Sequence, residues 1–122
     1  MKQKRSITNQ LTLDIQNYLF KKRIFAWRQN VTGIPLLNGC MRPASKKGIP
    51  DLLGCARGHF FGIEVKTGAD RLSDAQKGFI ASTENSGGRV FVAHNLEDLK
   101  RDFEEWDRES LLVCFSRLKG ER

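Results

Sequence analysis

The sequence predicts an α/β fold with a mixed central β-sheet flanked by helices, in the order α-β-β-β-α-β-α. Apolar residues recur at helical spacing at the start and near the end of the chain, and a capping box marks a further helix past the middle. Short runs rich in Phe, Val and Ile lie between these segments, as strands do. The length of 122 residues suits one compact domain, spanning 1–122, in which such elements pack as layers.

The first helix is capped by Ser6 or Thr8 and runs to about Lys22. Its apolar stripe consists of Ile7, Leu11, Ile15, Tyr18 and Leu19. The next segment, residues 24–30, alternates as a strand does and places its two aromatic residues on one side. We expect Trp27 of this strand in the core rather than as a platform for stacked bases.

Residues 31–50 are interrupted by Gly and Pro and are predicted to form a long loop, which in a compact domain is usually functional or mobile. Two strands follow, at residues 51–56 and 60–67, joined by the sequence "RGH" as a hairpin. With a turn at this place the numbers of paired residues sum to roughly 116, so Asp51 is expected opposite Val65.

A second helix begins at Ser73, which forms a capping box with Gln76 and so fixes the start of the helix. It ends at a pair of glycines, and residues 89–94 follow as a buried strand. Asn95 caps the last helix. The apolar residues of that helix are Leu96, Leu99, Phe103 and Trp106. The tail "SLLVCFSRL" is compatible with either helix or strand.

Positive charge is concentrated in the first part of the chain. The formal net charge is +7, and residues 1–50 hold ten Lys or Arg but a single acid, Asp14. Residues 51–122 hold eleven Lys or Arg and thirteen acids, so they are slightly negative. A basic region of this kind is typical of proteins that bind a polyanion, most often a nucleic acid.

The remaining composition excludes several other classes. No apolar run is long enough to span a membrane, and the basic start of the chain lacks the apolar segment of a secretory signal. We therefore expect a cytoplasmic protein. Its three cysteines, Cys40, Cys55 and Cys114, form no CxxC pair, so we expect reduced thiols rather than a zinc site.

The hairpin brings three charged side chains together. Glu64 and Lys66 lie two residues apart and share one face of the strand, while Ile63 and Val65 point into the core. Asp51 joins them from the first strand of the hairpin. An E-x-K pair in a strand is often no more than a solvated ion pair, and a Pro-Asp sequence is often a turn. Here the spacing predicts that all three side chains meet.

Two carboxylates beside apolar strands destabilise each other unless a cation lies between them. A hard divalent ion suits oxygen ligands, and Mg²⁺ typically uses one or two carboxylates together with water and a substrate phosphate. The backbone carbonyl of Val65 is a plausible further ligand. Lys66 is placed to polarise an attacking water or to stabilise charge on a phosphate. These parts indicate metal-assisted hydrolysis of a phosphodiester.

The sequence resembles the VRR-NUC (virus-type replication-repair nuclease) branch of the PD-(D/E)XK nuclease superfamily over about residues 6–103. The motifs that carry the resemblance are "KGIPD" at 47–51, "EVK" at 64–66, "LSDAQ" at 72–76 and the glycine pair before "RVFVAH". The segment "WRQN" also resembles the family's sequence after its first helix. Small stand-alone members occur in phages and bacteria, which implies a bacterial or phage-infected host cytoplasm.

The resemblance implies a restriction-endonuclease-like core and an endodeoxyribonuclease that depends on Mg²⁺ or Mn²⁺ and selects DNA by structure. It further implies a homodimer that cuts branched DNA such as four-way (Holliday) junctions in DNA repair. Flaps, forks or plain duplex DNA remain alternative substrates. A catalytically decayed module that binds junctions without cutting them is the alternative from another class. Candidate dimer contacts are Leu36, Leu37 and the tail from Leu111 to Phe115.

By position, the resemblance makes Asp51 and Glu64 metal ligands, Lys66 the catalytic lysine and Gln76 the active-site glutamine. The last can serve in the capping box as well. The family usually has a Glu early in the first helix, and this sequence departs from that pattern. Gln10 or Asp14 is the candidate replacement as a further metal ligand, although a helical Asp is often simply solvated. The residues expected to contact the DNA backbone are Arg28, Arg42, Lys46 and Lys47.

Overall fold

The computed structural model describes residues 6–29, 34–35, 41–42 and 46–118, with side chains for 6–29 and 46–113. Its elements are α1 (Ile7–Lys21), β1 (Phe25–Arg28), β2 (Ile34–Pro35), β3 (Met41–Arg42), β4 (Leu52–Ala56), β5 (His59–Val65), α2 (Asp74–Asn85), β6 (Arg89–Ala93) and α3 (Leu96–Leu118). The predicted α/β class and element order are confirmed. The expected loop at 31–50 is interrupted by the short antiparallel pair β2–β3, which forms a separate two-stranded sheet.

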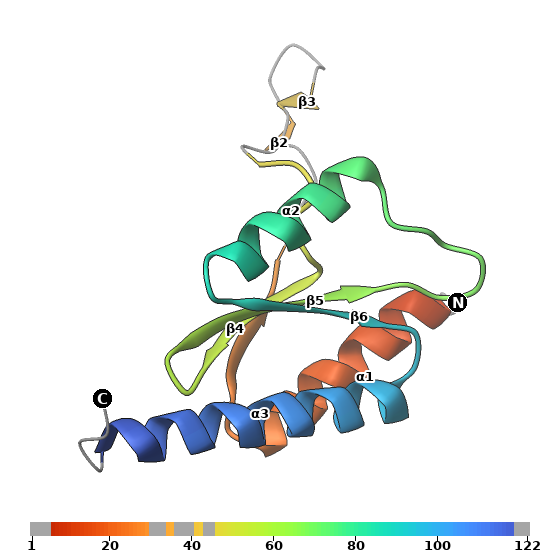
Figure 1. Cartoon of the computed structure of the whole chain (residues 1–122). Helices are drawn as coiled ribbons and strands as arrows, with labels where there is room; N and C mark the ends of the chain where they lie inside the picture. Colours follow the sequence, from red (N-terminus) through yellow and green to blue (C-terminus); the bar gives the residue numbers. More distant parts are fainter. Residues whose placement is uncertain (1–5, 30–33, 36–40, 43–45, 119–122) are drawn as a thin grey trace.

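The main sheet has four strands in the order β1-β4-β5-β6. The pairs β1–β4 and β4–β5 are antiparallel, and β5–β6 is parallel, so the sheet is mixed as predicted. Helices α1 and α3 lie along one face of this sheet and α2 lies over the other (Figure 1). The parallel pair requires a crossover, and α2 supplies it.

The hydrophobic core fills the space between the sheet and the pair α1 and α3. Its buried residues are Ile15, Leu19, Leu52, Ala56, Phe61, Ile63, Val65, Phe91, Ala93, Leu99 and Phe103. The stripe predicted for α1 is correct at Ile15 and Leu19 and wrong at Ile7, which is 79% exposed. The buried face of α1 consists of Thr12, Ile15 and Leu19, with the half-buried Thr8 one turn before Thr12. Ile7 is rotated about 100° around the helix from Thr8, so its side chain points away from this face.

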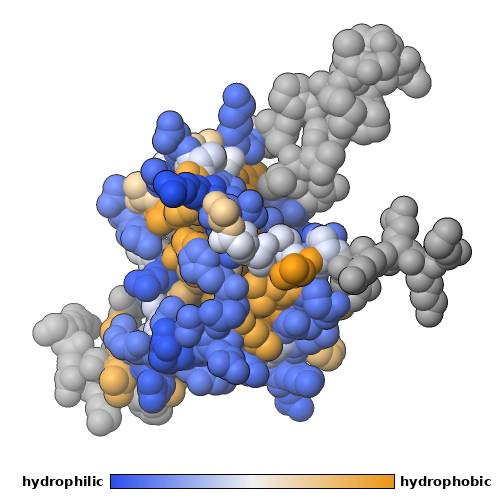
Figure 2. All heavy atoms as spheres, turned by 90° about the vertical axis from the view of Figure 1, so that its right-hand side faces the viewer, coloured by the Kyte–Doolittle hydropathy of each residue, from blue (hydrophilic) through white to orange (hydrophobic). Residues whose placement is uncertain are grey.

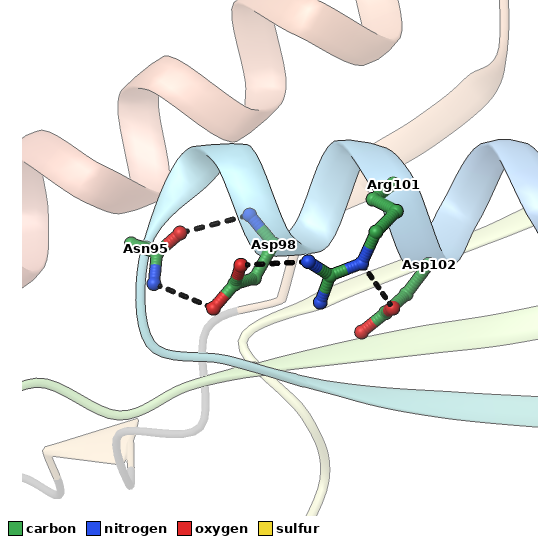
Figure 3. Close-up of polar contacts among 4 residues, drawn as sticks. All are labelled: Asn95, Asp98, Arg101 and Asp102. Atoms are coloured by element: carbon green, nitrogen blue, oxygen red, sulfur yellow. Dashed lines mark hydrogen bonds and ion pairs between the residues drawn. The ribbon is translucent and has the colours of Figure 1, made fainter.

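Each helix begins at the cap that the sequence predicted. The Ser6 hydroxyl accepts from the Asn9 amide at the start of α1. At α3, the Asn95 side chain accepts from the Asp98 amide at 2.8 Å and donates to the Asp98 carboxylate at 2.9 Å (Figure 3). Arg101 then pairs with the same carboxylate at 3.2 Å. The ambiguous tail continues α3 as helix, and no described helix is both long and apolar enough to cross a membrane.

The β4–β5 hairpin turns more tightly than the sequence analysis assumed. Arg57 and Gly58 both have positive φ, 55° and 79°, which is the two-residue turn that matches the twist of paired strands. His59 therefore belongs to β5 and pairs with Ala56. The predicted register was wrong by one residue, because Leu52 pairs with Ile63. Continued by one step, the observed register sets Asp51 across from Glu64, not from Val65.

Candidate active site

Glu64 is a buried acid on the sheet face that α2 covers. Its neighbours in β5, Ile63 and Val65, point into the core on the other face, as the alternation of the strand predicted. Only 3% of Glu64 is exposed. Lys66 follows directly after β5 and is half-buried. The one-residue change of register places Asp51 on the same face as Glu64, so the structure brings the two carboxylates closer than the sequence analysis expected.

Backbone contacts hold Asp51 in this position. Its carbonyl accepts from the Gln29 amide at 2.8 Å, which ties it to the end of β1. Its side-chain Oδ2 accepts from the Val65 amide at 2.8 Å, which ties the carboxylate to the end of β5. The preceding Pro50 is fully buried, and a Cβ on Gly62 would lie 2.8 Å from its ring. The Pro50 ring therefore fits only against a glycine at position 62 of β5. Because Pro50 is packed in this way, the backbone that carries Asp51 is held in place.

Gln76 connects α2 to the buried acid. Its Oε1 accepts from the Ser73 amide at 2.8 Å, and its own amide donates to the Ser73 hydroxyl at 3.1 Å, so the predicted capping box is present. Its Nε2 donates to Glu64 Oε1 at 3.0 Å. The capping box and the contact of Gln76 with Glu64 therefore coexist. Because its oxygen is engaged in the cap, its amide nitrogen is the group that faces the carboxylate.

Gly48 lets the preceding loop approach the first turn of α2. Its φ is +76°, and a Cβ built there would overlap the Ala75 carbonyl oxygen and lie 2.7 Å from the Gln76 nitrogen. No side chain other than hydrogen fits this space. In the sequence Gly48 stands out only as part of the motif "KGIPD", because close approach between distant segments leaves no local signal beyond the glycine itself.

The chain immediately after Glu64 is fixed by contacts that the sequence analysis did not foresee. The Lys66 amide donates to the Ala93 carbonyl at 2.9 Å, and the Lys66 carbonyl lies 3.0 Å from His94 Nδ1. The hydroxyls of Thr67 and Thr8 are 2.6 Å apart, which joins this segment to α1. These contacts set the backbone from which the Lys66 side chain projects. In the sequence these contacts were indicated only by the polar residues that follow the strands, such as Thr67 and His94.

The two acids affect each other strongly. The pKa of the Glu64 carboxyl is raised from its ordinary value of 4.5 to about 8, first because burial desolvates it and next because Asp51 lies beside it with a negative charge and a hydrogen bond. Lys66 acts in the opposite direction through its positive charge. The three side chains named from the sequence therefore occupy one electrostatic site.

The raised pKa has a defined consequence for stability. The folded-state pKa of Glu64 lies above the unfolded value, so folding takes up a proton at intermediate pH. The contribution of the neutral carboxyl to stability is complete below about pH 4.5 and is lost as the pH rises to about 8. A cation bound between the acids would favour the ionised form and remove this loss.

This donor set suits a hard divalent cation. Two carboxylates meet with too little positive charge to balance them, and oxygen ligands of this kind are those that Mg²⁺ and Mn²⁺ prefer. The Val65 N–H points toward Asp51. The Val65 carbonyl points to the same side, because the N–H and the C=O of one strand residue point toward the same neighbouring strand. Asp51, Glu64 and the Val65 carbonyl are therefore the groups that fit an ion.

The first-helix candidates, Gln10 and Asp14, line a hollow at the start of α1. Gln10 Nε2 donates to Asp14 Oδ1 at 2.9 Å, and both side chains line a hollow of about 480 Å³ between the starts of α1 and α3. Figure 2 views this side and shows apolar surface gathered between hydrophilic residues. In residues 6–29 and 46–113 no three His, Cys, Asp or Glu side chains gather as metal ligands would, so Asp14 does not join Asp51 and Glu64.

Comparison with known proteins decides the family. A family model described as the VRR-NUC domain matches residues 7–95, which is most of the chain. The chain belongs to the VRR-NUC domain family. No curated protein and no solved structure matches it. The matched span contains Asp51, Glu64, Lys66 and Gln76 and ends where α3 begins, and it indicates a nuclease-type fold.

The predicted DNA contacts of this VRR-NUC domain are placed in part. Lys46 and Lys47 are exposed just before Pro50 and Asp51. Arg28 is exposed at the end of β1, where its Nη2 donates to Asn9 Oδ1 at 2.9 Å. Asn9 thus links the start of α1 to the end of β1. The side chain of Arg42 lies outside the described residues.

The predicted dimer contacts of the VRR-NUC domain are described only near its end. Leu112 and Val113 are 67% and 46% exposed on α3, and Leu111 is half-buried. The side chains of residues 114 and 115 lie outside the described residues, as do Leu36 and Leu37. Homodimer formation through these residues stays a prediction.

Proposed function

We propose that this VRR-NUC domain is a divalent-metal-dependent DNA endonuclease that hydrolyses phosphodiester bonds in branched DNA, four-way junctions included. The observation that carries the proposal is the convergence of Asp51 and Glu64, with the positive charge of Lys66 acting on the same site. A buried acid beside a second carboxylate is costly for a small domain to maintain, and pKa values perturbed in this way cluster at functional sites.

Asp51, Glu64 and the Val65 carbonyl would hold Mg²⁺ or Mn²⁺. When bound, such an ion lowers the pKa of water and neutralises charge on a phosphoryl oxygen. The chain's own contribution begins with orientation. The Val65 amide fixes one oxygen of Asp51, and Gln76 fixes one oxygen of Glu64.

Lys66 provides the mobile positive charge of the site. It lies on the same face as Glu64, and its backbone is held by Ala93 and His94. From there its ammonium group can hold the attacking water or stabilise the negative charge that builds on the scissile phosphate. Lys46 and Lys47 are exposed beside the same site and would bind the DNA backbone without reading its sequence.

A homodimer would match a symmetric branched substrate, because two sites related by a two-fold axis can cut two strands. Flaps, forks and plain duplex DNA are the alternative substrates for the same chemistry. A module that binds junctions without cutting them is the other alternative. The oriented carboxylates and Lys66 favour the enzyme over that module, because binding alone requires no buried acid beside a second carboxylate.

The test is incubation of the purified protein with end-labelled four-way junctions, flaps, forks and duplexes of one sequence, with Mg²⁺, Mn²⁺ or EDTA. We expect cutting that requires the metal and is fastest on a branched substrate. Equal cutting of duplex and branched DNA would remove the structural selectivity. Tight binding without cutting in either metal would contradict the proposal and favour the non-catalytic module.

A further inference from the structure

The sheet face that carries the acids is only partly covered. Helix α2 lies over this face, where Gln76 reaches β5 and a Cβ on Gly88, just before β6, would meet Thr83 (Figure 1). Toward the β1 edge the aromatic side chains remain open to solvent. Phe25 is 69% exposed, Trp27 is 42% exposed and Phe60 is 39% exposed. The expectation that Trp27 lies in the core was wrong.

Strand register shows that these aromatic residues and the acids share one face. Phe25 pairs with Cys55, and Cys55 pairs with Phe60, so the two phenylalanines lie in one row across β1, β4 and β5. Trp27 belongs to the next row on β1, two residues along the strand. Phe60 and Glu64 are four residues apart in β5, which places them on the same face. The exposed aromatic group, Phe25, Trp27 and Phe60, thus continues the surface of the site.

The geometry of this aromatic group is suited to flat ligands. The rings of Phe25 and Trp27 meet edge to face, with centroids 5.4 Å apart and planes at 86°. The indole nitrogen donates to Gln29 Oε1 at 3.2 Å, which limits rotation of the Trp27 ring. Two exposed rings held at fixed angles on a strand offer π-faces to a ligand at little entropic cost.

Charge decides between two kinds of occupant. The chain carries +7, and its first fifty residues, which include β1, hold ten of the basic residues and one acid. A second copy of the chain would carry the same net positive charge, which opposes association of two copies at this face. A nucleic-acid strand with unpaired bases instead satisfies both features, because its phosphates meet the basic residues and its bases stack on the rings.

We propose that Phe25, Trp27 and Phe60 form a stacking platform for unpaired bases of a DNA strand beside the site that contains Asp51 and Glu64. This inference rests on the proposed nuclease function and specifies its substrate. Bases inside a duplex keep their faces stacked on each other, so only unpaired nucleotides can use the platform. The domain would therefore select branched DNA that has single-stranded nucleotides next to the branch.

The experiment measures binding without catalysis. A dye-labelled single-stranded 12-mer is titrated with protein in EDTA, and fluorescence anisotropy is recorded. The Phe25→Ala/Trp27→Ala variant should bind at least about tenfold more weakly than the unmodified protein, from the usual contribution of stacked bases. Phe20→Ala is the matched control, because Phe20 is 82% exposed but lies on α1. It should leave affinity unchanged, and Trp27→Phe should retain most of it.

A strand of abasic sites separates stacking from phosphate binding. The unmodified protein and the double variant should bind this abasic strand equally, because the strand has no bases that could stack on the rings. Equal loss on normal and abasic strands, or no loss with either, would overturn the platform. So would a protein that sediments as a dimer when unmodified and as a monomer when doubly substituted, because the rings would then be a contact between copies. Since EDTA prevents catalysis, failure of nuclease activity is scored separately.

Discussion

Replacing Lys66 by alanine is expected to lower the rate of DNA cleavage by about a hundredfold to a thousandfold, the usual effect of removing one group that stabilises transition-state charge. The variant should keep its fold, because Lys66 is half-buried and its fixed contacts are made by the backbone. Its affinity for DNA in EDTA should change little. The measurement is single-turnover cleavage of a labelled junction with Mg²⁺ or Mn²⁺, alongside anisotropy binding.

Lys21→Ala is the control for this variant. Lys21 is exposed in the last turn of α1, so its removal lowers the net charge by the same amount away from the acids. Cleavage by this variant should stay within about twofold of the unmodified protein, since a distant surface charge is screened by salt. Equal losses in both variants would mean that Lys66 acts only as one of many positive charges.

Replacing Gly48 by alanine is expected to reduce both stability and activity. The positive φ costs an alanine about 1 kcal/mol, and the overlap with the first turn of α2 adds about 1–3 kcal/mol. Because the overlap falls on Ala75 and Gln76, relief requires α2 to move and the bond from Gln76 to Glu64 to lengthen. Urea denaturation gives the free energy of unfolding, and the junction assay gives the activity.

Gly58→Ala separates the two contributions. Gly58 has nearly the same φ, +79°, but a Cβ there meets no atom within 4 Å. That variant should lose only about 1 kcal/mol of stability, from the backbone conformation alone, and should cut DNA normally. If the two variants behaved alike, the close approach of Gly48 to α2 would not contribute to the site.

Local signals were sufficient for the elements and for the identity of the acids. Capping residues predicted the starts of helices α1, α2 and α3. Strand alternation predicted that Glu64 lies on the face of the sheet away from Ile63 and Val65. Register was harder to predict. Whether His59 belongs to the turn or to β5 depends on the conformation of Arg57 and Gly58, and an error of one residue moves Asp51 to the other face.

Features that depend on contact between distant segments were not predictable from the sequence. The fit of Gly48 against α2 and the contact of Thr8 with Thr67 each join residues far apart in the chain. The exposure of Trp27 is of the same kind. Alternation predicts on which face of the sheet a side chain lies. Whether that face is covered at Trp27 depends on the position of α2, which alternation does not predict.

The most direct test of the central claim, that Asp51 and Glu64 form one cation-binding pair, is the free energy of unfolding at pH 8 with and without Mn²⁺. Without metal, the free energy of unfolding of the Glu64→Gln variant should be higher than that of the unmodified protein by about 2 kcal/mol, because the substitution removes a buried charge beside Asp51. Near pH 5 the two should be similar, since Glu64 is then neutral in the folded state. With Mn²⁺ at pH 8 the order should reverse, because only the intact pair binds the ion well. Equal Mn²⁺ stabilisation of both proteins, abolished instead by Asp14→Asn, would contradict the account.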